Sequence, residues 1–240
     1  MRFIIMHKTN AQWEAGAIPG PALIARVGTL IGDLAKAGIL IAGEGLRASS
    51  HGVRLKFAAG KRTVVNGPFE GGNELPAGFS ILRARSLDEA IDFASRQAEV
   101  LGDLEIDIRP VTEPWDIGMR PAPKSANTRR YMVLRKATPA TEHGSPTPEQ
   151  RAKLMRLIED ATRRGLHLTT ETMRPSARGR RYMNSRDGVS MFDGPFVESK
   201  EMIAGYVIVS AESLADVDRW VRRYLDVVGA DEVDILELEA

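Results

Sequence analysis

The sequence predicts an α+β protein in which one domain occurs twice in tandem. Two observations lead to this expectation: motifs of the first half return in the second half, and each half alternates strand-like apolar runs with amphipathic helical runs. The chain has 240 residues, 43% hydrophobic and 27% charged. That composition is ordinary for globular proteins, and the length suits one large domain or two small ones.

The repeat has a constant spacing of 127 positions. The tetrapeptide Asn66–Phe69 (Asn-Gly-Pro-Phe) returns as Asp193–Phe196 (Asp-Gly-Pro-Phe). The apolar segment Arg2–Lys8 matches Arg130–Lys136 with a shift of one residue. These matches indicate a duplicated domain.

We expect a first repeat over residues 1–111, a linker over 112–128 and a second repeat over 129–240. The linker contains Pro114, Pro121 and Pro123 and has little apolar periodicity, which is typical of an extended connection.

The second repeat shows its elements most clearly. Tyr131–Leu134 is a short apolar run and predicts a strand. Thr147 is a good N-cap, Pro148 suits the first helical position, and Gln150 completes a capping box. A helix therefore begins here and ends at Gly165, a residue type that often terminates helices.

The rest of the repeat adds strands, a hairpin and a second helix capped by Ser213. The expected strands are Leu166–Met173, Arg180–Asn184, Val189–Asp193, Met202–Val209 and Glu232–Leu238. Without the hairpin this order is βαββαβ, the ferredoxin-like unit, with two helices on one sheet face. The other sheet face needs a cover. We expect the two repeats to supply it by pairing as an intramolecular dimeric α/β-barrel.

Composition excludes several kinds of function. The chain has no cysteine, so it has no disulfides, thiolate metal sites or cysteine nucleophiles. A formal net charge of +1 gives no broad attraction to nucleic acids or anionic membranes. No apolar run is long enough to cross a membrane, and the scattered histidines His51, His143 and His167 predict no metal site. We expect a cytoplasmic protein without a cofactor.

The motifs of the second repeat together resemble a known family. Asp193–Phe196 is followed by the run Glu198–Glu201, by Ala204–Tyr206 and by Ser213 and Leu214. This succession is similar to the YCII-related superfamily, in particular to its DGPF-domain branch. The resemblance implies a ferredoxin-like, dimeric α/β-barrel fold. It also implies a His/Asp pair, proposed as an active site in some relatives, and a genomic association with extracytoplasmic-function sigma factors.

The catalytic candidates are His7 and Asp193, which come from different repeats. The first repeat has Asn66 in place of Asp193, and an amide cannot accept a proton as a carboxylate can. The second repeat has Arg135 in place of His7. A His/Asp site would therefore have to be assembled from both repeats. In the alternative, Asp193 only stabilises a turn, a role that Asn66 would serve equally well.

The candidate ligand-binding residues are Glu44, Arg47, Asn66, Glu171 and Arg174. Glu44 and Arg47 are repeated as Glu171 and Arg174, at the end of a strand, where ligand sites often gather. An arginine there could bind a carboxylate through two hydrogen bonds. The alternative is a structural ion pair or a turn contact.

Three functions remain open. The first is a small-molecule binding module for an anionic metabolite, with a regulatory role among its options, because binding needs only a barrel and a few polar groups. The second is an enzyme that uses His7 and Asp193 for proton transfer. The third, implied by the family resemblance, is an interaction partner of sigma-factor transcription machinery. We expect no nucleic-acid or membrane partner, and a homo-oligomer is compatible with the sequence.

Overall fold

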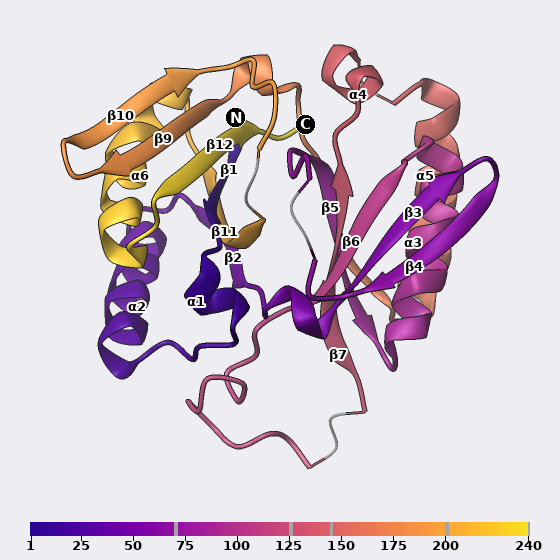
Figure 1. Cartoon of the computed structure of the whole chain (residues 1–240), viewed down its shortest axis with the longest axis horizontal. Helices are drawn as coiled ribbons and strands as arrows, with labels where there is room; N and C mark the ends of the chain where they lie inside the picture. Colours follow the sequence, from indigo (N-terminus) through magenta and orange to yellow (C-terminus); the bar gives the residue numbers. More distant parts are fainter. Residues whose placement is uncertain (70–71, 125–126, 145, 200–201, 240) are drawn as a thin grey trace.

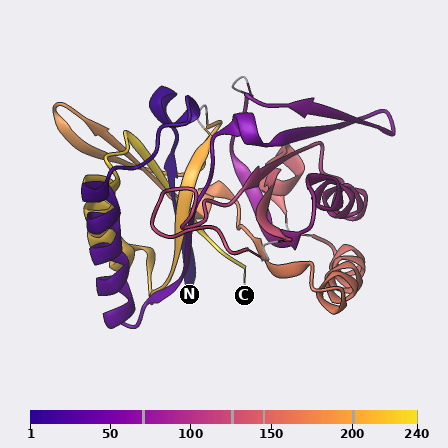
Figure 2. The same cartoon turned by 90° about the horizontal axis from the view of Figure 1, so that it is seen from below.

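Two antiparallel sheets stack face to face, and two helices cover the outer face of each (Figures 1 and 2). This computed structural model describes residues 1–69, 72–124, 127–144, 146–199 and 202–239. The outer helices are α2 (Pro21–Lys36) and α6 (Leu214–Val228) on the first sheet, and α3 (Leu87–Leu101) and α5 (Pro148–Arg163) on the second. The α+β class predicted from the sequence is confirmed.

The first sheet has six strands in the order β10-β9-β12-β1-β11-β2. Their bounds are Gly188–Asp193 (β10), Arg180–Ser185 (β9), Glu232–Glu237 (β12), Arg2–Lys8 (β1), Ile203–Ser210 (β11) and Leu40–Gly45 (β2). All neighbours are antiparallel. The four strands β12-β1-β11-β2 form the ferredoxin-like part, and the β9–β10 hairpin extends it at one edge.

The second sheet has the equivalent order β4-β3-β6-β7-β5-β8. Its strands are Lys61–Asn66 (β4), Val53–Ala58 (β3), Glu105–Pro110 (β6), Arg129–Lys136 (β7), Pro76–Ala84 (β5) and His167–Thr172 (β8). The β3–β4 hairpin lies at its edge, as β9–β10 does in the first sheet.

Neither sheet consists of a single sequence repeat. The first sheet takes β1 and β2 from the first repeat and β9 to β12 from the second. The second sheet takes β3 to β6 from the first repeat and β7 and β8 from the second. Each ferredoxin-like unit thus combines the opening βαβ segment of one repeat with the remaining strands of the other, so the two repeats are interlocked.

The main core lies between the sheets and contains side chains from both, including Met6, Phe79, Met132 and Tyr206. The expectation that the two inner faces cover each other is confirmed. The expected α/β-barrel is not a closed one. At two corners the sheets are joined only by isolated bridges, one of them between Leu46 and Val111, so within the described residues no continuous ladder closes the circle.

Helix ends follow the capping signals of the sequence. The Gln150 amide donates to Thr147 Oγ1 over 3.2 Å, and the Asp216 amide donates to Ser213 Oγ over 3.3 Å. Both interactions belong to capping boxes. Gly165, just after α5, has φ of +70°, a left-handed conformation that glycine adopts without a steric penalty.

Two short helices that the sequence did not indicate precede the long ones. They are α1 (Ala11–Glu14) and α4 (Pro139–His143). Each supplies a glutamate that accepts the amide of a serine in a 3-10 turn: Glu142 accepts from Ser176 over 3.0 Å, and Glu14 accepts from Ser49 over 2.9 Å. In the described part of the chain, no helix combines the length and the apolar character that crossing a membrane requires.

Candidate functional site

The Asp-Gly-Pro-Phe turn is fastened to the 3-10 helix Ser176–Arg178. The Phe196 amide donates to Ser176 Oγ over 2.9 Å, and a Cβ atom added to Gly194 would lie 1.8 Å from the Ser176 carbonyl oxygen. Only glycine fits such a close approach. The first repeat has the same geometry around Ser49, Gly67 and Phe69. Each turn is therefore packed tightly against a 3-10 helix, which gives it a structural role.

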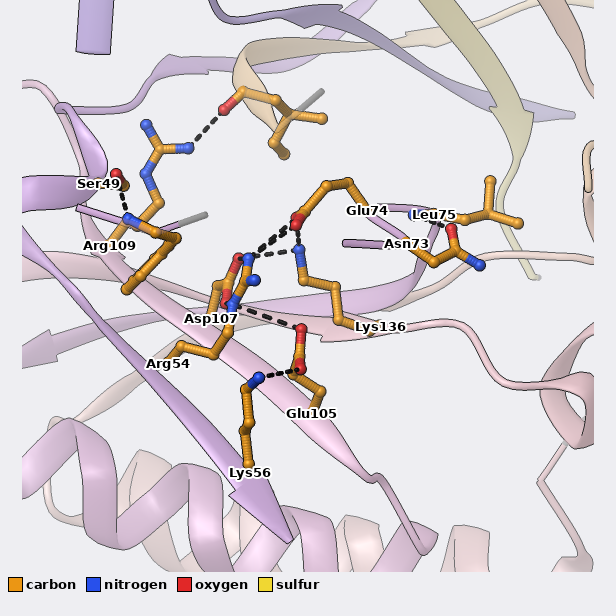
Figure 3. A network of polar contacts seen from close by, with 12 residues as sticks. Ser49, Arg54, Lys56, Asn73, Glu74, Leu75, Glu105, Asp107, Arg109 and Lys136 are labelled. Carbon is orange, nitrogen blue, oxygen red and sulfur yellow. Dashed lines mark hydrogen bonds and ion pairs between the residues drawn. The ribbon is translucent and has the colours of Figure 1, made fainter. Parts of the chain in front are cut away.

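Under the first turn lies a buried charge cluster of Arg54, Glu74, Asp107 and Lys136, which Figure 3 shows (the first cluster). Arg54 donates to Asp107 over 2.6 and 2.9 Å and to Glu74 over 2.8 and 3.1 Å. Lys136 Nζ lies 2.8 Å from Asp107 and also contacts Glu74. Two cations thus face two carboxylates, and Arg54 also covers the ring of Phe69 at 4.7 Å.

An equivalent cluster lies under the second turn and contains Lys8, Arg181, Glu232 and Asp234 (the second cluster). Lys8 Nζ is 2.8 Å from Asp234, and Arg181 Nε is 2.6 Å from the same carboxylate. Lys8 also donates to Ser199 Oγ over 2.7 Å. The motif residues Lys200 and Glu201 lie outside the described residues.

The lysine of each cluster comes from the other repeat than its arginine and aspartate. Lys136 stands on β7, whereas Arg54 and Asp107 stand on β3 and β6. Burial, followed by the charges of Arg54 and Lys8, lowers the pKa of Lys136 well below its usual value. Burial alone would raise the pKa of Asp234, but Lys8 and Arg181 outweigh it and hold that pKa below its usual value. In the second cluster the ion pairs thus favour the charged aspartate, whereas in the first cluster burial disfavours the charged lysine; in both, the contacts link strands of different repeats.

The structure places the two catalytic candidates in the same sheet but does not bring them together. His7 Nδ1 lies 2.7 Å from the Tyr224 hydroxyl, and burial lowers the pKa of His7 to about 4. Asp193 is exposed and accepts from Arg180 Nε over 2.7 Å. Two strands, β9 and β12, separate β10 from β1, a spacing of roughly 14 Å between their strand axes. A proton-transfer pair of these two side chains has no geometric support.

The candidates Glu44 and Glu171 form ion pairs that cross between the two sheets. Glu171 on β8 accepts from Arg2 on β1 over 2.7 and 2.8 Å. Glu44 on β2 contacts Arg130 on β7. Burial raises the pKa of Glu44, while Arg130 opposes that rise. These pairs correspond to the structural alternative raised by the sequence.

The remaining ligand candidates lie apart from one another. Arg47 is 3.0 Å from His51 and 3.9 Å from Asp116. Arg174 is 3.1 Å from Glu237. Asn66 ends the edge strand β4 and is exposed. These side chains do not converge on one pocket.

A groove of about 420 Å³ opens between the end of β11, the start of α6 and the turn after α2 (the Trp220 groove). Its apolar lining includes Ile39, Val209, Val217 and Trp220. Its charged lining consists of Arg219, whose guanidinium carbon is 5.3 Å from the centroid of the Trp220 ring, and of Glu212 and Asp216. The Asp216 carboxylate accepts hydrogen bonds from the amide and the hydroxyl of Ser213.

The equivalent position in the other half holds a second groove of about 300 Å³ (the Phe93 groove). Phe93 and Leu166 take the places of Trp220 and Ile39, and Asp92 takes the place of Arg219. The pseudo-symmetry of the fold thus makes a similar groove twice, but the charged residues that line the two grooves differ: Arg96 and Arg164 also line the Phe93 groove.

The sequence analysis did not identify the lysines of the two charge clusters, nor did it identify the Trp220 groove. Lys8 and Lys136 could have been noticed as a shared basic residue at the end of the matched first strands. Trp220 stands outside the apolar stripe of its helix, and an indole in such a position is a signal of its own.

The comparisons with known proteins address the family. The model of the YCII-related domain matches the chain twice, over residues 1–113 and 129–236. No curated protein and no solved structure matches the chain significantly. Among the described residues, no three acidic or histidine side chains are grouped so that they could hold a metal ion. The two matches leave little of the sequence uncovered, and the chain therefore belongs to the YCII-related domain family, of which it carries two tandem copies.

Proposed function

We propose that the protein is a small-molecule binding module and that its ligand, a small planar carboxylate, binds in the Trp220 groove. The observation that carries this proposal is the combination of an aromatic wall and an uncommitted arginine in one groove. Arg219 is exposed, and within the described residues it has no carboxylate partner.

The size and the lining of the groove suit this function. Its volume of about 420 Å³ falls in the range of roughly 300 to 1,000 Å³ that is common for ligand sites. Ile39, Val209 and Val217 offer apolar contact, and the half-buried Trp220 offers a ring on which a planar ligand can stack. A guanidinium beside such a surface binds a carboxylate through two parallel hydrogen bonds.

The other arginines nominated from the sequence are less available. Arg47 and Arg174 contact Asp116 and Glu237, respectively, so a ligand would have to compete with a carboxylate of the protein. The Phe93 groove has Asp92 at the position of Arg219, and its arginines are paired: Arg96 lies 3.8 Å from Asp160, and Arg164 lies 3.5 Å from Glu89. The proposal therefore assigns the anion to one groove of the two.

A thermal-shift experiment tests the assignment. The probes are benzoate, phenylacetate and indole-3-acetate, each compared with its neutral amide. A ligand present at 100 times its Kd stabilises the folded state by about 2.7 kcal/mol, which is readily detected. We expect a shift with at least one carboxylate and a smaller one with its amide.

Four variants locate the site. Arg219→Ala and Trp220→Phe should reduce the shift, whereas Arg222→Ala should retain it, because Arg222 is an exposed arginine of the same helix that does not line the groove. If a carboxylate still raises the melting temperature of Arg219→Ala but not that of Arg47→Ala, the ligand binds beside Arg47, at the corner formed by Leu46 and Val111, and not in the Trp220 groove. No shift with any probe would contradict the proposal.

A further inference from the structure

Strand β10 is an exposed sheet edge with apolar side chains. It is the terminal strand of the first sheet and pairs only with β9. Five of its six residues are exposed, and Met191 and Phe192 keep 41% and 53% of their surface in contact with solvent. Such an edge presents unpaired backbone groups together with apolar surface, a combination that favours pairing with another strand.

The equivalent edge strand β4 is protected in a way that β10 is not. β4 begins with Lys61 and Arg62, and basic residues at an edge discourage strand pairing. Arg62 is also held by Ser95 of α3 over 2.8 Å. β10 has no charge between Gly188 and Asp193, while both hairpins pair in unbroken register. The two repeats thus differ at the feature that controls pairing at the sheet edge.

We propose that β10 is a self-association surface at which it pairs antiparallel with β10 of a second copy of this chain. Two identical edges that meet across a two-fold axis close the assembly, whereas β10 pairing with β4 of another copy would leave further edges open. The first sheets of the two copies then form one continuous sheet.

Charge and the number of paired residues together select the register. A two-fold axis normal to the sheet places one residue of β10 opposite its own copy. An axis at Ser190 would set Asp193 opposite Asp187 of the second copy, and like charges directly opposite are unfavourable. An axis at Met191 sets the two Met191 side chains opposite each other and Phe192 opposite Ser190, with no like charges opposed. Axes at Val189 or Phe192 also oppose no like charges, but each would pair only three residues of β10, whereas the axis at Met191 pairs the five residues 189–193. The Met191 register is therefore the one we assign.

The test compares Met191→Lys with Val64→Lys by light scattering coupled to size-exclusion chromatography over a range of concentrations. Val64 occupies the equivalent position on β4 and is also 41% exposed, so it is a matched control. We expect a dimeric wild type, a monomeric Met191→Lys and a dimeric Val64→Lys. Circular dichroism melting should show that both variants fold, because both side chains lie at the surface.

Three outcomes would overturn the inference: a monomeric wild type, a Met191→Lys variant that remains dimeric, or equal dissociation by both substitutions. The result is independent of the ligand proposal, because the Trp220 groove lies at α6 and the β11 end, not on β10.

Discussion

We predict that Arg54→Met strongly destabilises the fold, because Arg54 compensates two buried carboxylates at once. Its side chain is 5% exposed, and those of Glu74 and Asp107 are 0% and 2% exposed. Methionine retains apolar volume but removes the charge and all four hydrogen bonds to these carboxylates. Lys136 alone would then face both carboxylates in the first cluster.

The magnitude follows from the cost of an uncompensated buried charge. Removing one partner of a buried ion pair costs about 3 to 5 kcal/mol. The net charge of the first cluster becomes one unit more negative, so one carboxylate binds a proton more tightly in the folded state than in the unfolded chain. A carboxyl group whose folded pKa is raised contributes stability that is lost as pH rises. The deficit of Arg54→Met should therefore be larger at pH 7 than at pH 5.

Urea denaturation followed by circular dichroism measures this deficit at both pH values. The control is Arg85→Met, because Arg85 is 75% exposed and pairs with Glu89 at the surface, where water screens the interaction. The reasoning would be refuted if Arg54→Met lost no more stability than Arg85→Met, or if its deficit grew as the pH was lowered.

Two further predictions concern stability. His7 binds a proton near pH 6.5 in the unfolded chain, but burial lowers its pKa to about 4 in the folded protein. Protonation between these pH values therefore favours the unfolded chain. The free energy of unfolding of the wild type should fall by up to about 2 to 3 kcal/mol as the pH is lowered from 6.5 to 4. Denaturation of His7→Asn should show a weaker pH dependence in this window, and an unchanged slope would exclude His7 as its source. Gly194→Ala should cost at least about 1 to 3 kcal/mol in thermal melting, because its Cβ would collide with the Ser176 carbonyl. Gly28→Ala, in α2 with open space around it, should instead stabilise by about 0.5 to 1 kcal/mol, and equal effects of the two would contradict the fastening role of the turn.

Local elements were predictable because their signals are local. The strand Arg2–Lys8 has the bounds expected from its apolar run. Thr147 and Ser213 begin helices as N-caps, since capping depends on residues only three positions apart.

The exchange of strands between repeats was not predictable from these patterns. Both repeats have the same apolar periodicity, so β1 fits equally well beside β5 or β11 by pattern alone. The choice depends on contacts far apart in the sequence, such as Lys8 with Asp234. Whether the barrel closes was not predictable for a similar reason, because periodicity specifies which faces are buried but not whether the sheet edges meet.

Polar residues that are identical in the two repeats turned out to form structural contacts and did not point to the candidate ligand site. Glu44 and Glu171 recur in both repeats because each pairs with an arginine across the sheets. The proposed ligand contacts Arg219 and Trp220 are replaced by other residues in the first repeat. A search for residues that are identical in both repeats therefore does not find them.

The central claim is that a carboxylate ligand binds against Trp220, and nuclear magnetic resonance of the indole N–H groups tests it most directly. The chain has three tryptophans, Trp13, Trp115 and Trp220, so their indole signals can be assigned with single Trp→Phe variants. Titration with the carboxylate that gives the largest thermal shift should move the Trp220 signal and leave those of Trp13 and Trp115 in place. Movement of the Trp115 signal alone, or of none of the three, would contradict the account.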